Sequence, residues 1–136
     1  MLDLRQFCAC CVIFLTVAGS VWSATASEQG FPFGRELMLD VAPMRGSKRV
    51  PILEIEQDGA ASLDLWCNSV RGKASVGEDS ITIVPDTAPP AQCAPERQSN
   101  DENLLAALSQ VTNWRRSGEV IELIGATTLR FRLMTN

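Results

Sequence analysis

The sequence contains no histidine and no tyrosine. Without histidine, Ser-His and Cys-His catalytic pairs and imidazole-based metal sites are excluded. The sequence also shows no Gly-rich phosphate loop and no pair of acids that stands out as catalytic. We therefore expect a protein that is not an enzyme, with no catalytic residues, no metal ligands and no cofactor.

A basic excess is also missing, because acidic residues outnumber basic ones and the net charge is −4. Binding to nucleic-acid phosphates needs a basic excess or a basic stripe, so we expect no nucleic-acid partner. After Val21, no apolar run in the sequence is long enough to cross a bilayer. We expect no stable membrane span in that part of the chain.

The first residues have the order of a secretory signal peptide. Arg5 precedes an apolar run over residues 7–21, and Ala24-Thr25-Ala26 forms a small-x-small cleavage site. We expect cleavage after Ala26, which removes residues 1–26 and places the protein in the periplasm or outside the cell. The apolar run is shorter than the roughly 20 residues of a spanning helix, and a retained membrane anchor is the alternative.

Only two cysteines, Cys67 and Cys93, follow the expected cleavage site. A cysteine pair in an exported domain favours a disulfide, which would tie a strand end to the loop before the helix. A buried thiol is the alternative, and a nucleophilic Cys67 has no recognisable base. The other three cysteines, Cys8, Cys10 and Cys11, lie too close to the start of the chain to be acylation sites, so we do not expect a lipoprotein.

Short segments of alternating apolar and polar residues dominate the remaining chain, which predicts β-strands with one buried face. To keep the apolar residues on one face, Gln57-Asp58-Gly59 must form a three-residue turn and Gly77–Ser80 a four-residue loop. The predicted strands contain Leu37–Val41, Leu53–Ile55, Ala61–Cys67, Val70–Val76, Ile81–Ile83, residues near Trp114, Val120–Ile124 and Thr128–Leu133.

The last two predicted strands have a register that the sequence itself indicates. A three-residue Gly125-Ala126-Thr127 loop keeps Phe131 on the buried face and pairs Glu122 with Arg130 on the outer face. In this register Arg132 has no acidic partner. We therefore interpret Arg132 as a possible recognition residue.

A single helix is predicted after a Pro-rich stretch, residues 85–95, that can be neither helix nor central strand. Ser99-x-x-Glu102 has the pattern of a capping box, and Leu104, Leu108 and Val111 follow at helical spacing. Strands, then one helix, then a closing hairpin predict an α+β domain built on an antiparallel sheet.

Residues next to Cys67 allow more than one interpretation. Trp66 has the outward parity of its strand, so it lies beneath the Pro-rich loop or is an exposed aromatic for recognition. Asn68 is expected to form the turn, and Gly72 to permit close packing or a bulge.

Acidic residues share the outer face of two predicted strands. Glu54, Glu56 and Asp64 could form a site for a cation or a basic partner. A solvated sheet face is the interpretation that we favour, because nothing in the sequence supplies ligand geometry.

Several of these residues together resemble the META domain, the family of HslJ, a heat-shock lipoprotein of bacterial envelopes. The family pattern is Cys-Asn with a glycine four residues after the Asn, and then a threonine shortly before a second cysteine. A glutamate that opens a leucine-rich helix and a closing β-hairpin follow. The matching residues are Cys67, Asn68, Gly72, Thr87, Cys93, Glu102, Leu108 and the hairpin Val120–Leu133.

The resemblance implies a curved, barrel-like sheet packed by one main helix, and no catalytic residues. Together with the expected cleavage after Ala26, it divides the chain into a signal peptide (1–26), a short linker (27–32) and a META/HslJ-like domain (33–133). The matching residues between the cysteines and in the helix would then be structural. The implied function is a non-enzymatic envelope module, related to stress, that binds a protein or a small ligand. The alternative is a small periplasmic inhibitor or assembly partner of another envelope protein.

Overall fold

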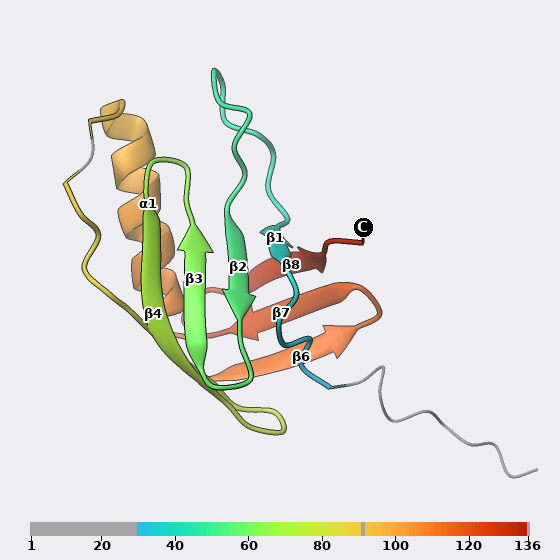
Figure 1. Ribbon diagram of the computed structural model, residues 1–136. Helices are drawn as coiled ribbons and strands as arrows, with labels where there is room; N and C mark the ends of the chain where they lie inside the picture. The colour runs from blue at the N-terminus through green and yellow to red at the C-terminus, as the bar shows by residue number, and fades with distance from the viewer. Residues whose placement is uncertain (1–29, 91, 136) are drawn as a thin grey trace, which may run out of the picture.

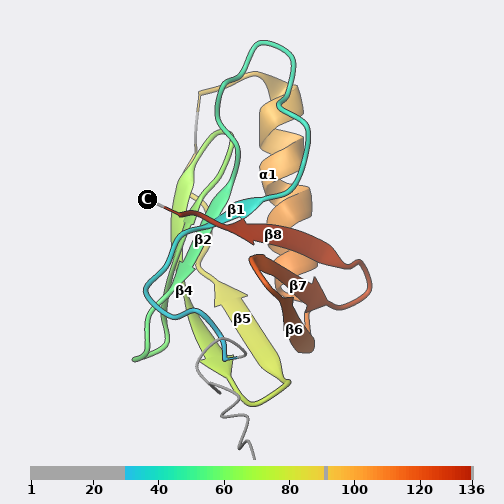
Figure 2. The same cartoon turned by 90° about the vertical axis from the view of Figure 1, so that its right-hand side faces the viewer.

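Antiparallel strands form one strongly curved sheet, and a helix lies on its concave side (Figures 1 and 2). The computed structural model describes residues 30–90 and 92–135. The expected signal peptide, its cleavage site and its three cysteines lie outside these residues. The elements are β1 (Leu37–Leu39), β2 (Ile52–Ile55), β3 (Ala60–Asp64), β4 (Ser69–Val76), β5 (Ile81–Pro85), α1 (Pro95–Leu108), β6 (Asn113–Ser117), β7 (Val120–Ile124) and β8 (Leu129–Leu133).

The sheet is nearly closed into a barrel. Its strand order is β5-β4-β3-β2-β1-β8-β7-β6, so β5 and β6 are the two edges. The edges meet at one end, where the Ile81 N–H donates to the Thr112 carbonyl at 2.9 Å and the Trp114 N–H donates to the Asp79 carbonyl at 2.9 Å. The expected α+β domain with a curved, antiparallel, barrel-like sheet and one main helix is therefore confirmed.

Side chains fill the interior of this sheet. Leu104, Leu108 and Val111 bring α1 and its C-terminal extension into the same core and are at most 6 % exposed, as predicted. Among the described residues, large side chains that are less than 2 % exposed include Leu37, Pro51, Leu53, Ile55, Leu63, Leu65, Ile81, Ile83, Leu108, Ile121, Leu123 and Phe131. The inside of the sheet is thus a packed core.

The predicted registers are confirmed where strands flank a turn. Ile55 lies opposite Ala61 across a turn in which the Gly59 N–H donates to the Glu56 carbonyl. Gly59 has a φ of 88°, a conformation that glycine adopts without a steric penalty. In the closing hairpin Glu122 lies opposite Arg130.

The alternation of inward and outward side chains no longer predicts burial where the chain stops being extended. β1 ends at Leu39, and Val41, expected in this strand, is 43 % exposed. β3 ends at Asp64, and the Leu65 N–H donates to the Asn68 carbonyl at 2.7 Å, which closes a turn. Trp66 lies in this turn, so the alternation that placed it outward does not apply, and its side chain is buried at 9 % exposure.

The predicted capping box is wrong. The helix begins at Pro95, four residues before Ser99, and its N-cap is Ala94, without a side-chain cap. Proline is favoured at this first position because its φ is preset and the N–H that it lacks would have no helical partner there. The Ala94 carbonyl accepts a hydrogen bond from the Arg97 N–H at 2.9 Å. Ser99 and Glu102 therefore lie inside α1.

The packed part of the chain extends into the expected linker. Phe31 and Pro32 are buried. The Phe31 ring meets Trp114 edge-on with centroids 5.2 Å apart, and it also contacts Phe33. These rings cover the core beside β6.

Candidate functional site

A buried carboxylate joins α1 to the turn after β3. Asp101 is 2 % exposed and accepts hydrogen bonds from three consecutive backbone N–H groups. The donors are Trp66 at 3.0 Å, Cys67 at 3.1 Å and Asn68 at 2.9 Å. Burial raises the pKa of Asp101, and the three N–H donors oppose that rise. Sequence reasoning missed this residue, although its spacing from Leu104 and Leu108 places it on the buried stripe of the helix.

The predicted disulfide lies beside this carboxylate. Cys67 is bonded to Cys93, and their Cα atoms are 6.2 Å apart, within the usual range for a disulfide. The backbone N–H of Cys67 therefore donates a hydrogen bond to Asp101, and its sulfur is bonded to Cys93 in the loop before α1. Together the two contacts fasten the helix to the β3–β4 turn. The two sulfurs are bonded to each other and the carboxylate accepts three hydrogen bonds, so we interpret this junction as structural.

The structure accounts for both residues that the sequence suggested for recognition, one by burial and the other by an ion pair. Trp66 belongs to the buried core, and so it offers no exposed aromatic surface. Its indole Nε1 is buried and has no hydrogen-bond partner among the described residues. The expectation that Arg132 lacks a partner is wrong, because its Nε lies 3.1 Å from Asp40 Oδ1.

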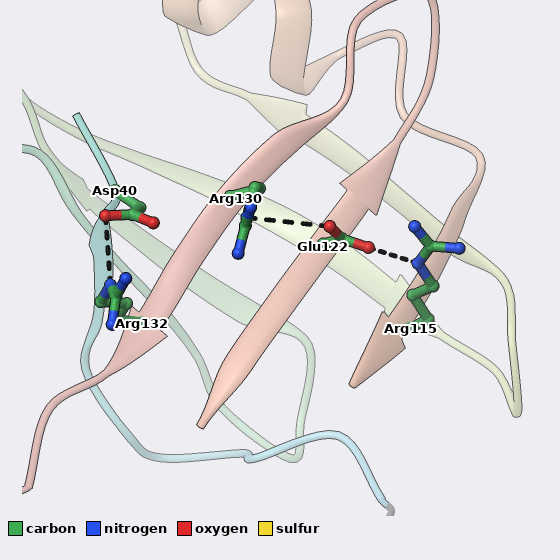
Figure 3. A network of polar contacts seen from close by, with 5 residues as sticks. All are labelled: Asp40, Arg115, Glu122, Arg130 and Arg132. Carbon is green, nitrogen blue, oxygen red and sulfur yellow. Dashed lines mark hydrogen bonds and ion pairs between the residues drawn. The ribbon is translucent and has the colours of Figure 1, made fainter. Parts of the chain in front are cut away.

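An ion-pair network covers the outer face of β6, β7 and β8 (Figure 3). Glu122 pairs with Arg130 at 3.7 Å, as the register predicted, and also with Arg115 on β6. The hydrogen bond from Arg132 is the main cause that lowers the pKa of Asp40. The arginines are more than half exposed, so solvent screens these ion pairs and each contributes little to stability. The pairs mainly neutralise the charges of the residues that form them. Strand pairing accounts for this cluster without a ligand.

The acidic face predicted on β2 and β3 is present but has no cation geometry. Burial is the main cause that raises the pKa of Glu54, and Glu56 and Glu36 add to the rise. Loss of solvation and the neighbouring carboxylates both disfavour the charged form of Glu54. Among the described residues, no group of three or more Cys, Asp or Glu side chains is arranged to hold a metal ion.

Several hollows lie on the surface of the described residues, and two of them are wide enough to consider as grooves. One, about 730 Å³, lies over β3 and β4. Its charged side chains have both signs, with Arg71 and Lys73 from β4 and Glu56, Asp58 and Asp86 from neighbouring segments. Opposite charges of this kind partly cancel, so this groove has no strong preference for an ion of either sign.

The second groove runs along α1, and we call it the helix groove. It consists of two adjoining depressions of about 460 and 190 Å³ that share Ala88, Glu102 and Leu105. One wall is the segment Val84–Pro90, and the other is a stripe of α1. The lining residues are Asn68, Val84, Pro85, Asp86, Thr87, Ala88, Pro89, Pro90, Gln98, Asp101, Glu102, Leu105, Ala106 and Ser109.

The helix groove collects three of the residues that carry the family resemblance. Asn68, Thr87 and Glu102 line it, whereas Leu108 is fully buried in the core. Gly72 has the close-packing role expected from the sequence, because a Cβ atom there would lie 2.7 Å from the Val84 carbonyl oxygen.

The sequence matches the family model of the META domain over residues 19–135, which is most of the chain. The chain therefore belongs to the META domain family, as the sequence pattern indicated. No curated protein and no solved structure matches it significantly. In the described part of the chain, α1 included, no helix has the length and apolar character needed to cross a membrane.

Proposed function

We propose that this chain is an exported, non-enzymatic envelope module that binds a partner on its outer surface, at the helix groove. The main support for binding on the outer surface is that the interior of the sheet is packed with side chains. Barrels that bind small ligands inside leave room between the strands, whereas here large side chains that are less than 2 % exposed, such as Leu108 and Phe131, occupy the interior. Binding then falls to the outside, where the helix groove offers an exposed apolar surface: Val84, on its wall, is 59 % exposed.

The reactive and charged side chains described above are bonded to one another or to the backbone, which supports a role without catalysis. Cys67 and Cys93 are bonded to each other, and Asp101 is held by three backbone donors. The arginines of the outer network are matched by carboxylates. A stress-related role follows only from the likeness to HslJ, and it belongs to the proposal.

A second form of the proposal is an inhibitor or assembly partner of another envelope protein. The rigid junction of α1 with the β3–β4 turn favours it, because a preorganised surface loses little entropy on binding. Both forms use the same groove.

Capture from the envelope fraction tests the proposal. Ala106→Arg places a long side chain in the groove at an exposed helical position, and Asn103→Arg makes the same addition on α1 outside the groove lining. We expect a stoichiometric partner that the wild-type protein and Asn103→Arg retain and Ala106→Arg loses. Equal capture by both variants would contradict the helix groove, and turnover of a substrate would contradict the non-enzymatic role.

Export is tested on the same sample. The mass of the protein recovered from the periplasm should correspond to a chain that begins at Ser27. A mass that still includes residues 1–26 would instead show a retained leader.

A further inference from the structure

The helix groove is long and narrow. Its helical wall runs along one stripe of α1 from Gln98 to the C-cap residue Ser109, a distance of about 16 Å at the usual rise of a helix. The segment Val84–Pro90 forms the facing wall. An extended polypeptide rises about 3.3 Å per residue, so the groove matches about five residues of an extended chain.

The charge of the groove has one sign. Asp86 contributes from the wall after β5, where it also borders the groove that holds Arg71 and Lys73, and Glu102 contributes from α1. The third acid of the lining, Asp101, is buried and accepts hydrogen bonds from three backbone N–H groups. The side chains of Asp86 and Glu102 are exposed, and among the described residues that line the groove none is a lysine or an arginine. Such a lining attracts a cation and repels an anion.

Apolar and polar side chains line the rest of the groove. Val84 is one of the exposed large hydrophobic side chains of the described residues, and Ala88, Leu105 and Ala106 lie along the same groove. An occupant of matching chemistry has apolar side chains on both sides of a basic one. A free metal ion would leave this apolar surface uncovered.

We infer that the helix groove binds an extended, basic and apolar segment of another envelope polypeptide, about five residues long, with a lysine or arginine between Asp86 and Glu102. The inference rests on the proposed function and names the chemistry of its partner. It assigns affinity to the apolar contacts at Val84 and Leu105, and selectivity to the two acids.

Three labelled probe peptides test it. Each is a capped pentapeptide of leucine and alanine, and they differ only in the central residue, which is arginine, glutamine or glutamate. Fluorescence polarisation with the full exported protein should show the arginine probe binding at least about tenfold more tightly than the glutamate probe. Raising the ionic strength from about 0.01 to about 0.1 M shortens the screening length from about 30 to about 10 Å and should reduce that ratio.

Matched variants locate the effect. Glu102→Lys should abolish the preference for arginine, whereas Glu96→Lys changes the same charge on α1 outside the groove and should preserve it. Val84→Ser should weaken all three probes, whereas Val41→Ser, at another exposed hydrophobic residue outside the groove, should weaken none. Thermal melts of each variant exclude unfolding as the cause.

The outcomes separate this inference from the proposed function. Equal binding of the arginine and glutamate probes overturns the basic segment, even if groove-dependent capture of a partner holds. An unchanged affinity in Val84→Ser overturns the apolar contact. Concentration-dependent dimerisation that Ala106→Arg abolishes would assign the groove to a second copy of this chain and overturn the inference. If Ala106→Arg loses neither partner nor probe, both proposals are overturned.

Discussion

Replacing Asp101 tests whether the junction between α1 and the β3–β4 turn holds the fold together. Asp101→Ala removes the acceptor of three backbone N–H groups, at Trp66, Cys67 and Asn68. Leaving a fully buried donor without a partner costs about 1–3 kcal/mol, and two of these three bonds are only partly buried. We expect a total loss of about 3–5 kcal/mol, a large share of the about 5–15 kcal/mol that stabilises a small domain.

Urea denaturation under oxidising conditions measures this loss. Asn103→Ala, at an exposed position on the same helix, is the control and should change the free energy of unfolding by less than about 0.5 kcal/mol. Asp101→Asn keeps one oxygen acceptor and should lose less than Asp101→Ala. If Asp101→Ala stays within about 1 kcal/mol of wild type, the three hydrogen bonds do not hold the junction and our reasoning is refuted.

The pH dependence follows from the raised pKa of Asp101. Between its ordinary value of 3.8 and the raised value, the native state binds more protons than the unfolded state. Stability from this group is then full below 3.8 and falls as the pH rises through the raised pKa. Relative to Asp101→Asn, which cannot titrate, the wild type should lose stability over that window. If the stability of the wild type relative to Asp101→Asn instead increases with pH over that window, the pKa of Asp101 is not raised in the folded protein.

Three further predictions concern stability. Replacing both cysteines of the disulfide with serine should cost roughly 3–4 kcal/mol, and the cost should disappear when a reductant is added to both proteins. Phe131→Ala should cost about 3–5 kcal/mol in urea denaturation, several times more than Glu122→Ala on the outer face of the same hairpin; equal costs would contradict the register. Gly72→Ala should lower the melting temperature because its Cβ would meet backbone atoms of β5, whereas Gly30→Ala, with open space around it, should not.

The alternation of apolar residues predicted the sheet well because a strand has only two faces. Ile55 and Ala61, or Glu122 and Arg130, sit on either side of a short turn, and a shift by one residue would expose the core. The same argument has no force where the backbone bends. Trp66 lies just beyond the end of β3, and its position follows from a turn that the pattern does not encode.

The start of α1 and the role of Asp101 were missed for a related reason. A capping box is a local pattern, and Pro95 starts the helix earlier by fixing its own φ. A charged residue on an apolar helical stripe normally indicates that the stripe has ended. Asp101 belongs to the buried face only because three N–H groups from a distant turn converge on it.

Arg132 shows how far long-range pairing limits a functional interpretation of the sequence. Within the closing hairpin it has no acidic neighbour, which made it a candidate for recognition. In the structure β1 pairs with β8, so Met38 lies opposite Arg132 and Asp40 comes within reach of its guanidinium. No local pattern states that the first strand pairs with the last. The helix groove is different, because its two walls are close in sequence and the disulfide between Cys67 and Cys93 fixes the loop that joins them. Its shape therefore depends on the junction of α1 with the β3–β4 turn, and mutations at Asp101 should affect partner binding as well as stability.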